Sequence, residues 1–172
     1  MSENLYRLVR DVPDFPKKGI LFRDITPILL DPDALREAVE ALAGPLKGRG
    51  LTKVAAIESR GFLLGAPVAM ALGLGLAIIR KPGKLPSDSH RVEYALEYGS
   101  DALEMHTDAL RAGDRAVIVD DVLATGGTAA AAAQLVSRSG ASVAGYGFLI
   151  ELAALEGRKR LTGDVHSVLT YR

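Results

Sequence analysis

The sequence contains no cysteine and no tryptophan, and only 5% of its 172 residues are aromatic. The absence of cysteine excludes disulfide bonds and every metal site built on thiolates. The charges balance, with 21 lysine and arginine residues against 21 aspartate and glutamate residues. A chain without net charge is a poor general binder of nucleic acids or of acidic membrane surfaces. We therefore expect neither nucleic acid nor a membrane among its partners.

Long apolar runs are also missing: none reaches the roughly 18 residues that a membrane-spanning helix needs. The three histidines (His90, His106 and His166) are too far apart in sequence for a histidine zinc centre. The first 15 residues read MSENLYRLVRDVPDF and lack the apolar core of a secretion signal. Together with the missing cysteines, this start predicts a cytoplasmic protein.

Hydrophobic residues make up 48% of the chain, and its length fits one domain over residues 1–172. Five short apolar runs are predicted strands, and they lie at 54–58, 76–80, 116–121, 143–150 and 165–170. Most of these runs are continuous, as in strands that are covered on both faces. Helical patterns lie between them, so we predict an α/β fold with a mainly parallel central sheet flanked by helices.

The predicted helices lie at 33–47, 61–72, 100–110 and 128–139. Asp31 and Pro32 suit the N-cap and the first turn of the first helix. The pair Gly44-Pro45 is expected to bend that helix or end it early. The helix at 128–139 is rich in alanine, and Gly140 stands where a C-terminal glycine belongs.

Two segments do not fit the alternation of strands and helices, and they lie at 11–31 and 81–100. The first is rich in proline and charge, and the second is long for a connection within a compact domain. Loops of that length are usually functional lids or disordered. Both segments are therefore candidate functional elements, and the alternative is that each is an irregular surface connection.

The strongest local signal is the stretch VIVDDVLATGGT at 117–128, where a predicted buried strand ends in two acids and a short loop opens the alanine-rich helix. Free backbone N–H groups at a helix N-terminus bind anions, and the helix dipole favours negative charge. The two glycines let the backbone approach a phosphate closely, and the threonines can add hydroxyl donors. The predicted phosphate-binding residues are Ala124, Thr125, Gly126, Gly127 and Thr128.

The acids of this stretch are Asp120 and Asp121. Successive strand residues face opposite sides, so we expect either an irregular strand end or two different tasks. Carboxylates beside a phosphate repel it unless a sugar diol or a metal lies between them, and a ribose 5-phosphate meets that condition. A solvated strand end is the alternative. The common nucleotide loop is excluded, because the pattern GxxxxGK[ST] does not occur.

The stretch VIVDDVLATGGT resembles the phosphoribosyl-diphosphate signature of the type I phosphoribosyltransferases. Five further segments resemble the adenine-using branch of that family, in the same order along the chain. They are Asp14–Leu29, Glu58–Pro67, Ile79–Pro86, Tyr94–Leu110 and Ile150–Leu161. The resemblance implies the type I phosphoribosyltransferase fold, with a small N-terminal hood at about 11–31 and a mobile lid loop at about 81–100.

The resemblance also implies an activity in purine salvage. The 5-phosphoribosyl group of phosphoribosyl diphosphate (PRPP) would pass to adenine, giving AMP and diphosphate. Members of this branch need Mg²⁺ and are usually cytoplasmic homodimers. We expect the Mg²⁺ to arrive on the oxygens of PRPP, near Asp120 and Asp121, and not in a dedicated protein cage.

The matching motifs imply roles for single residues. Arg60 would stabilise the departing diphosphate, although a surface arginine is the alternative. The residues implied to bind PRPP are Ser59, Arg80, Lys81, Lys84, Asp120, Asp121, Ala124, Thr125, Gly126, Gly127 and Thr128. The cations at 80–84 have a solvated loop cluster as their alternative reading.

The implied adenine site consists of Leu21, Phe22 and Arg23, with the Phe22 ring stacked on the base and the backbone reading its edge. An ordinary core aromatic is the alternative for Phe22. The lid would carry Tyr98 and Glu97, and Glu97 would take the proton from the imidazole ring of adenine. An exposed lid acid is the alternative for Glu97, and the nearby acids Glu93 and Glu104 remain open as the base.

Two other functions remain open at this stage. The first is a phosphoribosyltransferase for xanthine, hypoxanthine or guanine, which the segment around Phe22 disfavours. The second is a regulator that senses PRPP without catalysis. The sequence has no spare helix-turn-helix region and no basic stripe, and this disfavours the regulator.

Overall fold

The central element of the computed structural model, which describes residues 2–95 and 99–172, is a five-stranded sheet. Its strands are β3 (Lys53–Ile57), β4 (Gly75–Ile79), β7 (Arg115–Leu123), β8 (Ser142–Leu152) and β9 (Val165–Tyr171). They are ordered β4-β3-β7-β8-β9, and every neighbouring pair is parallel. The predicted parallel sheet is confirmed. The predicted strand end at Asp121 is wrong, because β7 runs on to Leu123 and pairs there with β8.

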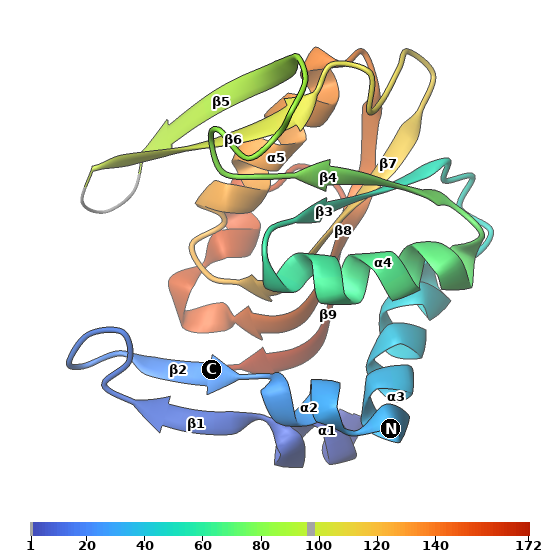
Figure 1. Cartoon of the computed structure of the whole chain (residues 1–172). Coiled ribbons are helices and arrows are strands. Elements are labelled where there is room, and N and C mark those ends of the chain that lie inside the picture. Colours follow the sequence, from blue (N-terminus) through green and yellow to red (C-terminus); the bar gives the residue numbers. More distant parts are fainter. Residues whose placement is uncertain (1, 96–98) are drawn as a thin grey trace.

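Helices cover both faces of this sheet (Figure 1). α3 (Pro32–Ala43) and α4 (Arg60–Leu72) pack on one face, and α5 (Gly127–Arg138) packs on the other. The short helices α1 (Ser2–Leu8) and α2 (Thr26–Leu30) lie beside α3. Within residues 2–95 and 99–172, no helix is long and apolar enough to cross a membrane.

The start and the end of α3 follow the sequence signals. The Asp31 carboxylate accepts hydrogen bonds from the backbone N–H groups of Asp33 and Ala34, each at 2.9 Å. Such a cap satisfies backbone donors that the first helical turn leaves without partners. The helix ends at Ala43, and the chain continues as a 3-10 turn, η1 (Gly44–Leu46), as the Gly44-Pro45 pair predicts.

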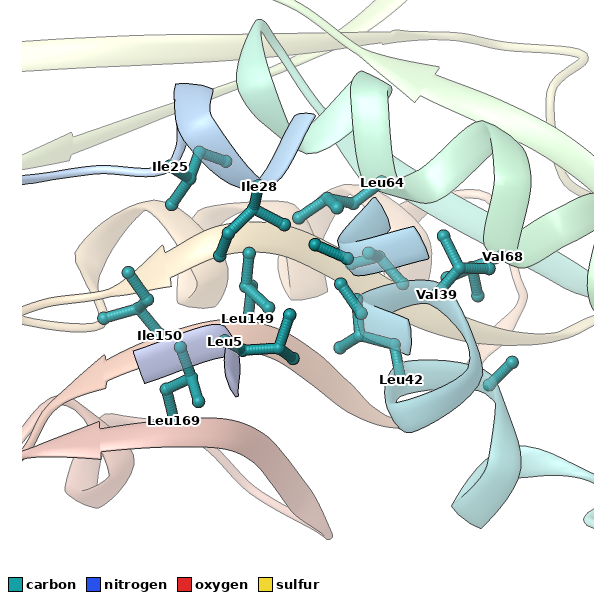
Figure 2. Packing of buried hydrophobic residues seen from close by; sticks show 14 of the residues in the cluster. Leu5, Ile25, Ile28, Val39, Leu42, Leu64, Val68, Leu149, Ile150 and Leu169 are labelled. Carbon is teal, nitrogen blue, oxygen red and sulfur yellow. The ribbon is translucent and has the colours of Figure 1, made fainter. Parts of the chain in front are cut away.

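Two apolar clusters, one on each face, hold the layers together. β7 supplies both, since Val117 and Val119 enter the first cluster while Ala116 and Ile118 enter the second. This division follows from the alternation of side chains along a strand. Figure 2 shows the first cluster, in which apolar side chains from α1 to α4 meet those of β8 and β9. The sheet is therefore held between two closely packed apolar layers.

Two antiparallel hairpins lie outside the central sheet. The first joins β1 (Arg10–Pro13) to β2 (Leu21–Asp24), and the second joins β5 (Ser89–Ala95) to β6 (Ser100–His106). Both hairpins project toward the side where the central strands have their carboxyl ends (Figure 1). In α/β sheets, ligands bind beyond those ends.

The helix predicted at 100–110 is wrong, because this stretch contains β6. Alanine, leucine, glutamate and methionine favour a helix in isolation, but tertiary pairing overrides so weak a preference. Leu103 and Met105 are 0% exposed and enter the second cluster, two positions apart as on one face of a strand. The stretch at 81–100, expected to be a loop, contains β5.

Gly65 marks the closest approach of α4 to β3. A Cβ atom at Gly65 would lie 2.4 Å from the Cβ atom of Ala56, so a side chain there forces the helix away from the sheet. We predict that Gly65→Ala lowers the free energy of unfolding by about 1–3 kcal/mol.

Gly44→Ala is the matched control, since φ is −50° and a Cβ atom there meets nothing within 4 Å outside the two neighbouring residues. Alanine restricts the unfolded chain, but Pro45 disfavours a helical conformation for a preceding residue with a Cβ atom, so the control should lose less stability than Gly65→Ala. Urea unfolding of both variants checks the prediction, and equal losses would contradict it.

Candidate functional site

The loop after β7 forms a small hollow at the carboxyl edge of the sheet. Gly126 has a φ of +80° and stands at the N-cap of α5, which begins at Gly127. The hollow has a volume of about 70 Å³, and the five predicted phosphate-binding residues at 124–128 all line it. Since one water occupies about 30 Å³, a group of a few heavy atoms such as phosphate is of fitting size.

A segment without a predicted role packs against this loop. It is the 3-10 turn η3 (Gly157–Arg160), which follows a similar turn, η2 (Ala153–Leu155). A Cβ atom at Gly126 would lie 2.3 Å from the Gly157 carbonyl oxygen, and one at Gly157 would lie 2.1 Å from the Ala124 carbonyl oxygen. Both positions therefore require glycine. At Gly127 the nearest contact would be an ordinary 3.6 Å, so the packing of the protein itself requires glycine at 126 but not at 127. The close approach of both glycines to a phosphate stays a prediction.

Asp120 is the buried member of the acid pair. The N-terminus of α4 packs on it, since a Cβ atom at Gly61 would lie 2.6 Å from its Oδ1 atom. Burial, and then the neighbouring charge of Asp121, raise the pKa of Asp120 well above its usual value. The Asp120 Oδ1 atom accepts a hydrogen bond from the Asp121 backbone N–H at 2.9 Å.

Asp121 has a different partner, because its carboxylate accepts a hydrogen bond from Arg60 Nε in an ion pair. A second cavity, of about 360 Å³, lies beside both acids. Its lining residues are Glu58, Ser59, Arg60, Lys81, Asp120, Asp121 and Thr128. The structure thus brings six of the predicted site residues to one cavity. This cavity lies next to the loop at 124–128, which we call the phosphate loop after its predicted ligand. The peptide bond between Glu58 and Ser59 is cis.

Two of the three predicted cations have carboxylate partners. Arg80 Nε donates a hydrogen bond to Glu58 Oε2 at 2.7 Å, and Lys81 Nζ pairs with the Asp101 carboxylate. The Lys81 hydrogen bond lowers the pKa of Asp101. Lys84 is exposed and does not line the cavity beside the acids. A solvated loop cluster therefore describes Lys84 but not Arg80 or Lys81.

Tyr94 of β5 links the second hairpin to the phosphate loop, and the sequence analysis missed it. Its hydroxyl lies 3.4 Å from the Thr128 Oγ1 donor and 3.3 Å from Asp101 Oδ2. Lys81 Nζ donates to the same hydroxyl at 3.3 Å. No local pattern could have marked Tyr94, because the pairing of β5 with β6 creates these contacts.

Phe22 of β2 is the predicted hood residue that reaches the site. The guanidinium carbon of Arg60 lies 5.2 Å from its ring centroid, and the ring is half-buried, not part of the core. Leu21 is exposed. The Arg23 side chain is engaged elsewhere, since it stacks over Tyr171 at 4.1 Å and pairs with an aspartate of β1.

Glu97 and Tyr98, the predicted base and lid residue, lie outside the described residues. The alternative bases have other surroundings. Glu104 Oε2 accepts the Gly83 N–H at 3.0 Å, and Glu93 is exposed and pairs with Arg91. Neither lines the cavity beside the acids.

Comparison with known proteins extends this picture. Residues 33–170 match the model of the phosphoribosyl transferase domain. The adenine phosphoribosyltransferase of Anaeromyxobacter dehalogenans strain 2CP-C is 58% identical over 172 residues, which cover 99% of this chain and 100% of that relative. The crystal structure of adenine phosphoribosyltransferase from Thermoanaerobacter pseudethanolicus matches with a TM-score of 0.97 at 50% identity, over 99% of this chain and 100% of that one.

The Saccharomyces cerevisiae enzyme of the same name is a more distant relative. Its crystal structure, complexed with adenine and D-2,5-dideoxy-2,5-imino-altritol 1,6-bisphosphate, matches with a TM-score of 0.92 at 38% identity, over 97% of both chains.

Replacement of Asp120 and replacement of Asp121 should have opposite effects on stability. The pKa of Asp120 is raised in the native state. Above the unfolded-state pKa of about 4, the native state therefore binds more protons than the unfolded state, and stability falls as pH rises. We predict that Asp120→Asn raises the melting temperature by a few degrees at neutral pH. The gain should vanish below about pH 4, where Asp120 is protonated in both states.

Asp121→Asn is the comparison variant, since it removes the ion-pair partner of Arg60 and should lower the melting temperature at neutral pH. Thermal unfolding of both variants between acid and neutral pH checks the pair of predictions. A gain for Asp120→Asn that does not depend on pH would contradict the raised pKa.

Proposed function

The chain belongs to the phosphoribosyltransferase family, and on this premise we propose how its residues carry out the reaction. The reaction transfers the 5-phosphoribosyl group from PRPP to adenine, giving AMP and diphosphate in purine salvage. The observation that best supports the proposed site is the meeting of the phosphate loop, the two acids and Arg60 at one edge of the sheet. The donor then lies across that edge.

The loop at 124–128 binds the 5-phosphate of the donor in this proposal. The residues at the start of α5 line the hollow, where their backbone N–H groups can bind an anion, and Thr125 and Thr128 add hydroxyls. The ribose extends toward Asp120 and Asp121, whose carboxylate oxygens accept hydrogen bonds from the 2- and 3-hydroxyls. The sugar hydroxyls also separate these acids from the phosphate charge.

The carboxylates of Asp120 and Asp121 suit a Mg²⁺ ion that arrives bound to the substrate. No group of three or more candidate ligands that could hold a metal occurs in residues 2–95 and 99–172, but Asp120 and Asp121 are adjacent oxygen ligands. Mg²⁺ is commonly held by one or two carboxylates plus substrate phosphates. When bound, it would supply positive charge that stabilises the diphosphate leaving group.

Ser59, Arg60 and the cations at 80–84 receive the diphosphate in our proposal. The bond between the anomeric carbon and the diphosphate oxygen breaks, and its electron pair leaves with the diphosphate. Arg60 is paired with Asp121, so it can turn to the leaving group as negative charge develops there. Lys81 can turn from its partner Asp101 to the diphosphate in the same way.

Adenine enters between the hood at 11–31 and the lid at 81–100. The base stacks on Phe22, and the backbone of Leu21 and Arg23 reads its edge. The N9 atom attacks the anomeric carbon with inversion, and its proton passes to Glu97 of the lid. Tyr98 helps the lid to exclude water, which would otherwise hydrolyse the activated sugar. One domain over residues 1–172 carries all these parts.

A homodimer is part of the same proposal. Apolar side chains are exposed on α4 and on the edge strand β4: Leu63, Met70 and Leu76. Leu76 lies against α4, because its Cδ1 atom would be 3.7 Å from a Cβ atom at Gly65. Exposed apolar surface of this kind is typical of protein interfaces. A cytoplasmic location stays a prediction from the sequence.

An assay of AMP formation tests the function directly. With adenine, PRPP and Mg²⁺ we expect AMP at a kcat of about 1–1000 per second, the usual range for enzymes. Guanine, hypoxanthine and xanthine should react at least about a hundredfold more slowly, because a site that pairs with the amino group of adenine leaves polar groups unpaired with a 6-oxopurine. Removal of Mg²⁺ with EDTA should abolish turnover. Equal turnover of a 6-oxopurine would overturn the assignment of the base.

The oligomeric state tests the proposed interface. Met70 is 83% exposed, and we predict that Met70→Glu converts a dimer into a monomer because it buries a charge at the interface. Leu30→Glu is the matched control, since Leu30 is likewise apolar and 80% exposed but belongs to α2 and not to α4 or β4. Sedimentation velocity measures both variants. A monomeric unaltered protein, or dissociation by Leu30→Glu alone, would contradict the interface.

A further inference from the structure

An ion pair between Glu151 and Arg158 lies behind the phosphate loop and belongs to no part of the reaction described above. Glu151 is buried near the carboxyl end of β8, where it is paired with Leu123 of β7. Arg158 Nε donates to Glu151 Oε1 at 3.0 Å, and Arg158 Nη2 donates to Oε2 of the same carboxylate. Two parallel hydrogen bonds of this kind fix the orientation of both groups.

The same arginine also ties its segment to β9. Arg158 Nη1 donates to the Val165 carbonyl oxygen at 2.6 Å, and Nη2 lies 3.4 Å from Ser167 Oγ. The guanidinium group thus joins η3 to β8 and β9 at once. Since both strands belong to the central sheet, the pair anchors η3 to that sheet.

Gly157, the residue before Arg158, carries this anchoring to the phosphate loop. Its position allows no side chain, because a Cβ atom there would lie 2.1 Å from the Ala124 carbonyl oxygen and 2.8 Å from the Gly126 nitrogen. The backbone of η3 is therefore in direct contact with the backbone that forms the phosphate hollow. A shift of η3 displaces the loop or leaves a gap behind it.

The turn between η2 and η3 contains an unfavourable backbone conformation. Glu156, between η2 and η3, has a φ of +53°, a left-handed conformation that is unfavourable for a residue with a Cβ atom. Such a conformation persists where the surrounding contacts impose it. Glu156 has local contacts, since its N–H donates to the Ala153 carbonyl oxygen and its carboxylate pairs with Lys159. The hydrogen bonds of Arg158 to Glu151 and Val165 add the connection to the central sheet.

The pair also removes a charge conflict. Glu151 is a buried carboxylate beside a site for an anion, and the Arg158 hydrogen bond holds the pKa of Glu151 below its usual value, so it is ionised. Without Arg158 its charge would repel a phosphate in the hollow. With Arg158 the pair has no net charge, so the loop N–H groups attract the phosphate without an opposing carboxylate charge.

We propose that Glu151 and Arg158 are positioning residues for the phosphate loop, and that through Gly157 they set the affinity of the site for the 5-phosphate of the donor. Neither residue lines the phosphate hollow or the cavity beside the acids. The proposal rests on the proposed function, since it takes the phosphate in the hollow to be that of PRPP.

The test compares Arg158→Gln, Glu151→Gln and the double variant, each as the full chain. Arg158→Gln should weaken the binding of PRPP with Mg²⁺, measured by calorimetry, by about tenfold or more, an effect typical of lost supporting contacts. The KM for adenine and kcat at saturating PRPP should stay within about twofold, because the acids, Arg60 and the hood are unaltered. The double variant should bind PRPP better than Arg158→Gln, since no unpaired carboxylate remains.

Arg49→Gln is the matched control. Arg49 forms an ion pair with Asp164, but both residues precede their strands and so lie at the amino edge of the same sheet. This variant should leave PRPP binding within about twofold of the unaltered protein. If Arg158→Gln does not fold, Arg158→Lys takes its place, since it keeps the charge and loses the fork, and it should weaken PRPP binding by a smaller factor.

Three results would overturn the proposal. They are unchanged PRPP binding in a folded Arg158 variant, an equal loss in Arg49→Gln, and an equally weakened KM for adenine, which indicates general destabilisation. The proposed function fails separately, if the unaltered protein binds PRPP and forms no AMP. In that case the calorimetric comparison still decides the role of the ion pair.

Discussion

The site depends on one constraint, the contact of backbone with backbone between Gly126 and Gly157. A phosphate that is bound by N–H groups needs those groups at fixed positions, and no side chain can adjust to correct an error. The loop therefore has to be supported from behind, and at 2.3 Å between a Cβ position and a carbonyl oxygen there is room only for glycine. Gly61 against Asp120 repeats this arrangement at the other end of the site, where α4 approaches β7.

The same constraint explains how a chain with no net charge can bind a strongly anionic substrate. Arg60, Arg80, Lys81 and Arg158 each have a carboxylate partner within the fold. The loop itself holds no basic side chain, so its affinity for an anion comes from backbone groups and the dipole of α5. These cations therefore have partners within the protein when no substrate is bound. In the proposed function, Arg60 and Lys81 would exchange their carboxylate partners for the diphosphate.

Prediction from the sequence succeeded where local chemistry decides the structure. The N-cap of α3 at Asp31, the five strands and the loop at 124–128 all follow from patterns within about ten residues. It failed at β6, where Leu103 and Met105 suit a helix and only pairing with β5 makes them a strand. It also missed Tyr94 and the Glu151–Arg158 pair, because their contacts join segments that are distant in sequence. A resemblance to a family marked the segment 150–161 but gave none of its residues a role.

The parts that local patterns predict and the parts that they miss have different roles in the molecule. The parallel sheet and its two apolar clusters carry the phosphate loop and the acids, and these parts are packed from both faces. The two hairpins lie outside that sheet, and Phe22 and Tyr94 reach the site from them. In the proposed function, a donor held at this edge of the sheet would fix the position of the anomeric carbon. Elements outside the sheet would then bring the base to that carbon. The phosphate loop keeps its anchor through η3 to β8 and β9, and Tyr94 adds a link from the second hairpin.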